Sequence, residues 1–224
     1  MGIVVIFVVI ITAVFVSLNQ KVSNEDKVWD KDTTIGNMEA KNYFIIYSDI
    51  ACPYCVAFEN AILENWEDFM RYIESNDVLV EVRVSDFLYE YGQSNPIASR
   101  YSAEAIYCAK KEGKFWDYYD LAIRTVWNAY FKEKGKSGFG DMNAQGKDYW
   151  INLGKEVGLS DSFEKCVKED ASLKEVMTIA AKTAKNIDGM PYFKFNSYIS
   201  SGFDMSWGWE YVKMYFDSGL KSSR

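Results

Sequence analysis

The sequence predicts an α/β fold in which a β-α-β unit and a β-β-α unit are separated by an all-helical insertion. Two apolar, β-favouring runs, Tyr43–Tyr47 and Val78–Val84, flank a segment with helical periodicity. From about residue 97 to 187 the apolar residues keep helical spacing. Strand character then returns at Tyr192–Phe195 and Tyr198–Ser200. This order of elements predicts a mixed sheet with helices packed against it.

The helices are predicted from apolar residues spaced three and four apart. The first helix is expected from Pro53 to about Ser75, and the last from about Ser206 to Leu220. A Gly-rich break at residues 135–140 interrupts the insertion. One apolar stripe is expected along the first helix: Cys55, Phe58, Ile62, Trp66, Phe69 and Ile73.

The first residues, Met1–Leu18, form an almost uninterrupted apolar run. As a helix of about 17 residues it would span roughly 25 Å, slightly less than a hydrocarbon core. Because no small-x-small cleavage site follows, we read an uncleaved membrane anchor, with a cleaved signal segment as the alternative. The lysines after the run would place the body in the cytoplasm by the positive-inside rule, which conflicts with the cysteine chemistry below. The predicted organisation is an anchor (1–20), a linker (21–40), a first half (41–96), an inserted helical domain (97–187) and a second half (188–224).

The composition excludes several classes of function. The formal net charge of −7 and the dispersed basic residues argue against a nucleic-acid partner, which would need a basic face. The chain has no histidine, so a His-based catalytic triad or a Cys/His zinc site is excluded. Neither a metal nor a cofactor is expected, and the chemistry must come from cysteine, carboxylates, Tyr, Lys or the backbone.

A Cys-x-x-Cys pair lies where the first predicted strand meets the first helix. Cys52 falls at the helix N-terminus, where free N–H groups and the helix dipole stabilise a thiolate. Pro53 at the first helical position lacks an N–H that would have no partner. Cys55 lies one turn further, on the apolar stripe, and is expected to be the less exposed thiol. The alternatives are half of a zinc knuckle or a purely structural disulfide.

A second signal is Met190-Pro191, which opens the third predicted strand. A proline at the start of a strand is usually only part of a turn. In this order of elements, however, a thioredoxin fold places a cis-proline beside the cysteine pair, and a cis bond is rare without a reason. The neighbouring backbone could pair with an extended substrate peptide.

Three segments, in family order, resemble the DsbA family of thiol–disulfide oxidoreductases, in particular its Gram-positive and actinobacterial branches. They are Tyr47–Cys55 around the cysteine pair, Glu104–Ala109 with Gly113–Asp120 in the insertion, and Ala184–Phe193 around the proline. The resemblance implies a thioredoxin fold and an enzyme that oxidises dithiols, with Cys52 as nucleophile, Cys55 as its partner and Pro191 at the substrate groove. It also implies unfolded secreted proteins with free thiols as substrates, and a membrane quinone-linked reoxidase of the DsbB or VKOR type.

The chain departs from this family at positions near the cysteines. Tyr54 stands where the enteric prototype has histidine, which predicts a milder oxidant. Ile46 occupies the position of an acidic residue found in thioredoxins and enteric relatives. Asp49 could tune proton transfer instead, or it could cap the active-site loop. Met190 replaces the common Thr or Val before the proline, which leaves the substrate preference open.

Two further cysteines, Cys108 and Cys166, fall on apolar helix faces. They could be two buried thiols, or a second disulfide that pins the insertion, as in some actinobacterial relatives. The disulfide is favoured, and because such a bond persists only in an oxidising compartment it predicts an extracytoplasmic body. We expect a monomer that is anchored to the membrane by residues 1–20. Two rival functions stay open: a disulfide reductase or isomerase of the same fold, and a non-catalytic anchored chaperone or binding module.

Overall fold

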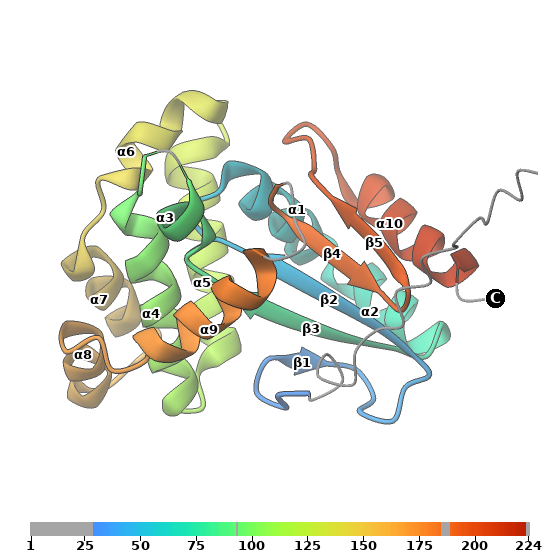
Figure 1. Ribbon diagram of the computed structural model, residues 1–224, viewed down its shortest axis with the longest axis horizontal. Coiled ribbons are helices and arrows are strands. Elements are labelled where there is room, and N and C mark those ends of the chain that lie inside the picture. The colour runs from blue at the N-terminus through green and yellow to red at the C-terminus, as the bar shows by residue number, and fades with distance from the viewer. Residues whose placement is uncertain (1–28, 93, 185–188, 223–224) are drawn as a thin grey trace, which may run out of the picture.

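The computed structural model describes residues 29–92, 94–184 and 189–222. Within them, five strands form one mixed sheet in the order β1-β3-β2-β4-β5 (Figure 1). Strand β2 pairs in parallel with β3 and antiparallel with β4, so it lies at the centre of the sheet. The strands are β1 Thr34–Ile35, β2 Asn42–Ser48, β3 Val78–Val84, β4 Tyr192–Phe195 and β5 Tyr198–Ser201. The predicted α/β order is therefore confirmed.

Two helices join the parallel strands β2 and β3, α1 Pro53–Glu64 and α2 Trp66–Ser75. The single helix predicted for this segment is wrong, because the chain turns at Asn65. There the Asn65 N–H is bonded to the Ile62 carbonyl, and Arg124 from the insertion donates to the carbonyl of Leu63 at 3.0 Å. The turn also displaces Trp66, which is 39% exposed instead of joining the apolar stripe.

The inserted segment is helical throughout its described residues, as predicted. Its first long helix, α4, begins at Ile97, but the short helix α3 before it was not predicted. Helix α9 returns across the sheet on the face opposite α1, α2 and α10 (Figure 1). The elements are α3 Phe87–Tyr91, α4 Ile97–Lys111, α5 Phe115–Val126, a π-helical turn Trp127–Phe131, a 3₁₀ turn Gly135–Gly138, α6 Phe139–Asn143, α7 Lys147–Glu156, α8 Asp161–Lys168 and α9 Leu173–Ala184.

Aromatic side chains fill the layer between the sheet and the last helix, α10 Trp209–Ser222. Phe44 on β2 packs against Phe216 of α10, with ring centroids 4.2 Å apart. Phe58 of α1 lies 4.4 Å from Phe193 of β4. Each of these rings is at most 1% exposed, so this cluster fixes α1 against the strand that precedes the cysteine pair.

The described part of the predicted linker is ordered against the sheet. Strand β1 pairs antiparallel with β3, Thr33 is buried, and Trp29 packs on Tyr43 at 5.3 Å. Residues 29–40 therefore belong to the folded domain. Within them β1 covers the edge of β3, whose backbone N–H and C=O groups would otherwise have no strand to pair with. The predicted anchor (1–20) and the start of the linker lie outside the described residues. Among the residues that are described, no helix is both long and apolar enough to cross a membrane.

Candidate active site

The cysteine pair lies at the turn from the central strand β2 into α1. Cys52 is the residue before the helix, with extended backbone, and Pro53 begins the helix. The Cys52 N–H is bonded to the Asp49 carbonyl at 2.9 Å, and the Cys52 carbonyl accepts the first helical bond from Val56. Cys52 therefore stands at the N-terminal end of α1, where the helix dipole favours a thiolate, as the sequence predicts.

The two thiols have different surroundings. Both are buried, but only Cys52 borders the groove beside the site, whereas Cys55 is fully enclosed. Burial is the main cause that raises the pKa of the Cys55 thiol, and the neighbouring Cys52 and Glu59 raise it further. Cys55 therefore holds its proton in the reduced site, and Cys52 is the sulfur that a substrate can reach.

The Met190–Pro191 peptide bond is cis and lies beside Cys52. The Cys52 sulfur is 4.0 Å from the Met190 carbonyl oxygen. The Pro191 carbonyl already accepts a hydrogen bond from the Gly202 N–H at 2.8 Å. The backbone that faces the sulfur is therefore that of Met190. The structure thus brings together Cys52 and the proline segment, 138 residues apart in the sequence.

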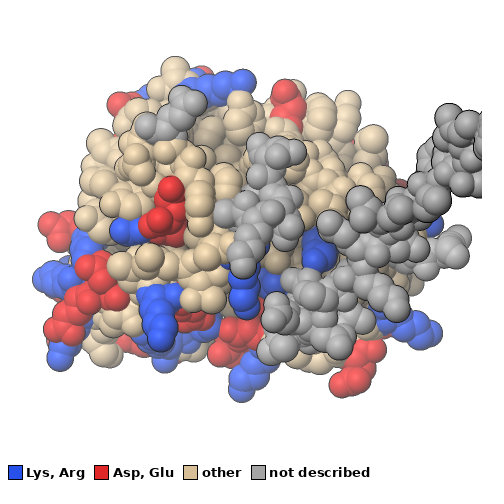
Figure 2. All heavy atoms as spheres, viewed as in Figure 1, with Lys and Arg blue, Asp and Glu red and all other residues tan. Residues whose placement is uncertain are grey.

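A groove of about 430 Å³ opens beside Cys52. It lies in the part of the molecule where α3, α6 and the start of α1 meet, and there the surface seen in Figure 2 carries mainly uncharged atoms. Lys136 is its one charged lining residue among those described, and its ammonium stands 5.1 Å from the centre of the Tyr54 ring. The apolar lining consists of Pro53, Tyr54, Phe87, Leu88, Phe139 and Met190.

Asp49 is fully buried under the active-site loop. Its carboxylate accepts hydrogen bonds from the N–H groups of Ala51 and Leu88 at 2.9 and 2.8 Å, and from the Ser99 hydroxyl at 2.6 Å. Burial raises its pKa to about 6, although these hydrogen bonds act in the opposite direction. Asp49 thus caps the loop, one of its two predicted roles, and ties it to α3 and α4.

The sequence interpretation missed Glu59, a buried carboxylate one helical turn after Cys55. It is 3% exposed, and neither oxygen has a hydrogen bond, although the hydroxyls of Ser48 and Tyr119 face it. Burial raises its pKa to about 7. Ile46, at the position where thioredoxins have an acid, is part of the apolar core. The signal was available, because an acid four residues after Cys55 shares its helix face.

Cys108 on α4 and Cys166 on α8 are joined in a disulfide. The bond crosslinks two helices of the insertion, as the favoured interpretation of the sequence has it. Glu104 lies beside these sulfurs, and these three residues form the one group of possible metal ligands in the described part of the chain. With both cysteines engaged in a disulfide, the group has no free thiolate to offer a metal.

Comparison with known proteins agrees with this geometry. The family model described as thioredoxin matches residues 29–208. In the curated sequences, a Na⁺/H⁺ antiporter NhaA 3 of Salinispora tropica is 31% identical over 96 residues. That match covers 42% of this chain but only 13% of the antiporter, so it says nothing about transport.

Solved structures with the same fold include three thiol–disulfide exchange proteins. MdbA, a thiol–disulfide oxidoreductase from Corynebacterium diphtheriae, has a TM-score of 0.57 at 17% identity, covering 84% of this chain and 90% of MdbA. The thiol–disulfide exchange protein α-DsbA2 from Wolbachia pipientis has a TM-score of 0.57 at 18% identity, covering 89% and 94%. Reduced DsbA from Mycobacterium tuberculosis has a TM-score of 0.53 at 16% identity, covering 86% and 95%.

The chain belongs to the thioredoxin family, and its fold is that of the DsbA-type proteins within it. The thioredoxin fold that the resemblance implies is thus confirmed. In this chain a Cys-Pro-Tyr-Cys pair lies at the start of α1, beside a cis-proline. This arrangement is typical of a disulfide oxidoreductase.

Proposed function

We propose that the protein introduces disulfides into secreted or surface proteins by dithiol–disulfide exchange through Cys52. The observation that carries this proposal is that Cys52, at the N-terminus of α1, opens into an apolar groove next to Met190. An apolar groove suits an unfolded chain, whose hydrophobic side chains are exposed. The backbone of Met190 can hold such a chain in an extended conformation.

The exchange has two steps. In the oxidised enzyme, a substrate thiolate attacks the Cys52 sulfur and forms a mixed disulfide, and Cys55 leaves as a thiolate. The buried carboxyl of Glu59 stands on the same helix face and is suited to give this thiolate its proton. The second substrate thiolate then attacks the substrate sulfur of the mixed disulfide, and Cys52 leaves. The substrate loses two electrons, which the enzyme keeps as its dithiol.

Activity can be tested with the full chain in its oxidised form and a reduced, unfolded protein that contains one pair of cysteines. Disulfide formation is monitored by alkylating the remaining thiols and measuring the masses of the products by mass spectrometry. The Cys52→Ser variant should form no disulfides in the substrate, whereas Lys213→Met, a surface change on α10, should match the wild type. If Cys52→Ser keeps full activity, the protein is a binding module and the proposal is wrong.

The direction of electron flow is set by the reduction potential of the Cys52–Cys55 pair. A value of about −120 to −180 mV, in the range of known oxidants and isomerases, supports disulfide donation. A value of about −230 to −270 mV identifies a reductase instead. The potential can be measured in glutathione buffers, with the two cysteine pairs followed separately by peptide mass mapping.

The proposal includes an extracytoplasmic location, with residues 1–20 as anchor and a quinone-linked membrane enzyme as reoxidase. The disulfide between α4 and α8 supports such a location, because reducing compartments do not keep these bonds. Labelling of intact cells with a thiol reagent that cannot cross membranes tests it. Cys52 should be labelled in cells that lack the reoxidase, and labelling only after lysis would place the site in the cytoplasm.

A further inference from the structure

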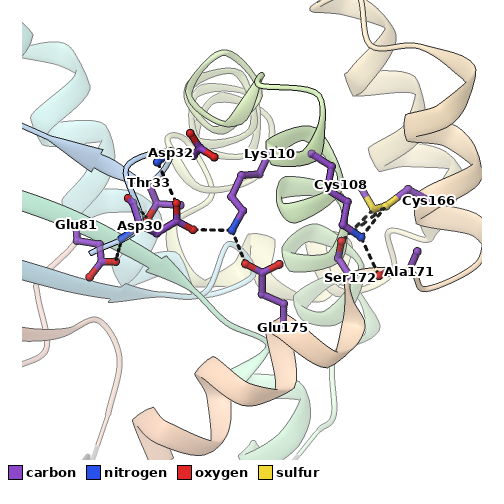
Figure 3. Close-up of polar contacts among 11 residues, drawn as sticks. Asp30, Asp32, Thr33, Glu81, Cys108, Lys110, Cys166, Ala171, Ser172 and Glu175 are labelled. Atoms are coloured by element: carbon purple, nitrogen blue, oxygen red, sulfur yellow. Dashed lines mark hydrogen bonds and ion pairs between the residues drawn. A yellow bond between two sulfur atoms is a disulfide. The ribbon is translucent and has the colours of Figure 1, made fainter. Parts of the chain in front are cut away.

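Polar side chains lie beside the disulfide in the insertion, and Figure 3 shows Ser172 next to its two sulfurs. Cys108 is buried, whereas Cys166 is half-buried at the edge of α8. The Lys111 ammonium stands 3.8 Å from the Cys166 sulfur. The Ser172 hydroxyl is 3.7 Å from each of the two sulfurs. A Glu104 carboxylate oxygen lies 3.5 Å from the Cys108 sulfur. The two sulfurs are thus surrounded by a cation, a hydroxyl and an acid.

A disulfide carries no proton and no charge, so the acid and the ammonium can exchange a proton with its sulfurs or stabilise a charge on them only once it is opened. Glu104 is fully buried, and one of its oxygens accepts a hydrogen bond from the Ser172 N–H at 2.7 Å. Its other oxygen has no partner. The oxygen that accepts the Ser172 N–H, Oε1, is also the one that lies 3.5 Å from the Cys108 sulfur, and Oε2 is the unpaired oxygen. Leaving a buried carboxylate oxygen unpaired is destabilising, and protonation of the carboxyl reduces that cost.

The arrangement repeats that of the active site. In each pair one cysteine is enclosed in the protein, Cys55 or Cys108, and has a buried acid one helical turn away on its own helix. The acids are Glu59 and Glu104, and each has an oxygen without a hydrogen bond. In each pair the other cysteine is the more accessible sulfur. The same three parts, an outer sulfur, an inner sulfur and a proton carrier, are therefore present twice.

We propose that Cys108–Cys166 is a second exchange-competent disulfide, which an external thiolate opens by attack on the Cys166 sulfur. The attacking compound is a small thiol or a protein dithiol. This site is separate from the Cys52–Cys55 pair and does not depend on the function proposed for that pair.

The reaction balances as an ordinary exchange. The external thiolate forms a bond to Cys166 sulfur while the bond to Cys108 breaks, and Cys108 leaves as a thiolate. Glu104, in its acid form, gives Cys108 its proton. A second external thiolate then attacks the mixed disulfide and leaves an external disulfide and a Cys166 thiolate, next to Lys111. Two electrons enter the protein, and the external dithiol is oxidised.

A hollow of about 590 Å³ is lined by Lys111 and Ser172, the two side chains that stand beside the Cys166 sulfur, although neither cysteine lines it. The Lys111 ammonium is held in place by a 2.8 Å hydrogen bond to the Ala171 carbonyl. Although Asp30, Glu81 and Glu175 also line the hollow, the Lys111 ammonium is 3.8 Å from the Cys166 sulfur and favours attack there by an anion such as a thiolate.

The proton carrier predicts a pH dependence. Burial raises the pKa of Glu104 to about 7, Asp170 raises it further, and Lys111, Lys147 and the Ser172 hydrogen bond lower it. Above this pH the carboxyl has lost its proton and cannot protonate the leaving Cys108 thiolate. The rate of opening, expressed per external thiolate, should therefore fall as the pH rises through about 7.

The test uses the full chain with Cys52→Ala and Cys55→Ala, so that only the second pair can react. Reduced glutathione is the probe, and the products are trapped by alkylation and mapped by mass. We expect a glutathione adduct on Cys166 and an alkylated thiol on Cys108. The rate should rise linearly with glutathione concentration. A denatured sample serves as the control that the assay detects the open form.

Two variants separate proton transfer from structural support. Glu104→Gln keeps an oxygen for the Ser172 N–H but cannot release a proton, so opening should slow roughly tenfold or more below pH 7 and lose its pH dependence. Lys111→Met should slow opening roughly tenfold. Lys174→Met, an exposed lysine that lines the same hollow, is the matched control and should not differ from its parent.

Several outcomes would overturn the proposal. The disulfide could stay intact in the native protein and open only in denaturant, glutathione could attach to Cys108, or the rate could be independent of glutathione concentration, which means opening by unfolding. An unchanged pH profile in Glu104→Gln would remove the role of that residue. If Glu104→Gln does not fold, the site of the adduct and the pH profile in its parent decide the question.

Discussion

Replacing Glu59 by glutamine should stabilise the protein at pH 8 and have little effect near pH 4. The Glu59 carboxyl is 3% exposed, and burial raises its pKa from 4.5 to about 7 although the hydroxyls of Tyr119 and Ser48 act in the opposite direction. Between these two values the folded protein holds a proton that the unfolded chain has released. The free energy of unfolding therefore falls as the pH rises through this window.

The magnitude follows from the two pKa values. At about 1.4 kcal/mol per pH unit, the interval from 4.5 to about 7 corresponds to about 3 kcal/mol of stability lost by pH 8. Glutamine carries no charge and escapes this loss. The buried groups Asp49 and Glu104 titrate in the same sense, so the wild-type profile is steeper than Glu59 alone explains. The difference between variant and wild type isolates Glu59.

The assay is chemical unfolding of the full chain at pH 4 and at pH 8, with the redox state of the cysteines held constant. The quantity of interest is the difference in free energy of unfolding between Glu59→Gln and wild type at each pH. Glu64→Gln, an exposed acid at the end of the same helix, is the control and should show no such change. A Glu59→Gln difference that is the same at both pH values would refute the argument, because it would mean that the carboxyl is not protonated by burial.

Three further predictions follow from the site and the core. The Cys55→Ala variant should accumulate mixed disulfides with substrate, because no second thiol remains to resolve them; their absence in a non-reducing gel would contradict the assigned roles. Asp49→Asn replaces an acceptor of the Ser99 hydroxyl by an amide group and should cost roughly 1–3 kcal/mol in chemical unfolding, and an unchanged midpoint would show that the loop does not need the carboxylate. Gly219→Ala would place a methyl group 2.0 Å from the Phe195 ring and should cost roughly 1–3 kcal/mol in thermal unfolding. An unchanged melting temperature would contradict this prediction and would mean that α10 shifts to make room.

Local patterns were sufficient for strands β2 to β5 and for the cysteine pair, whereas β1 lies in the predicted linker. Strand β3 has the predicted bounds, and β2 extends the predicted run by one residue at each end, because β-branched and aromatic residues in a buried run specify an interior strand. Asn65 shows the limit of this reasoning. The apolar spacing continues through it, whereas at the break the Leu63 carbonyl accepts a hydrogen bond from Arg124, which is 61 residues from Leu63 in the sequence.

The sequence by itself determined the order of the elements, the position of Cys52 before α1 and the thioredoxin fold, because each depends on neighbouring residues or on motif order. Only the tertiary structure decided that Met190 faces Cys52, that Glu59 lies unpaired behind Cys55, and that Glu104 and Lys111 flank the second disulfide. These facts depend on burial and on distances between segments far apart in the chain. Both are properties of packing. The sequence identifies a carboxylate but does not show whether the folded chain leaves it in water or encloses it.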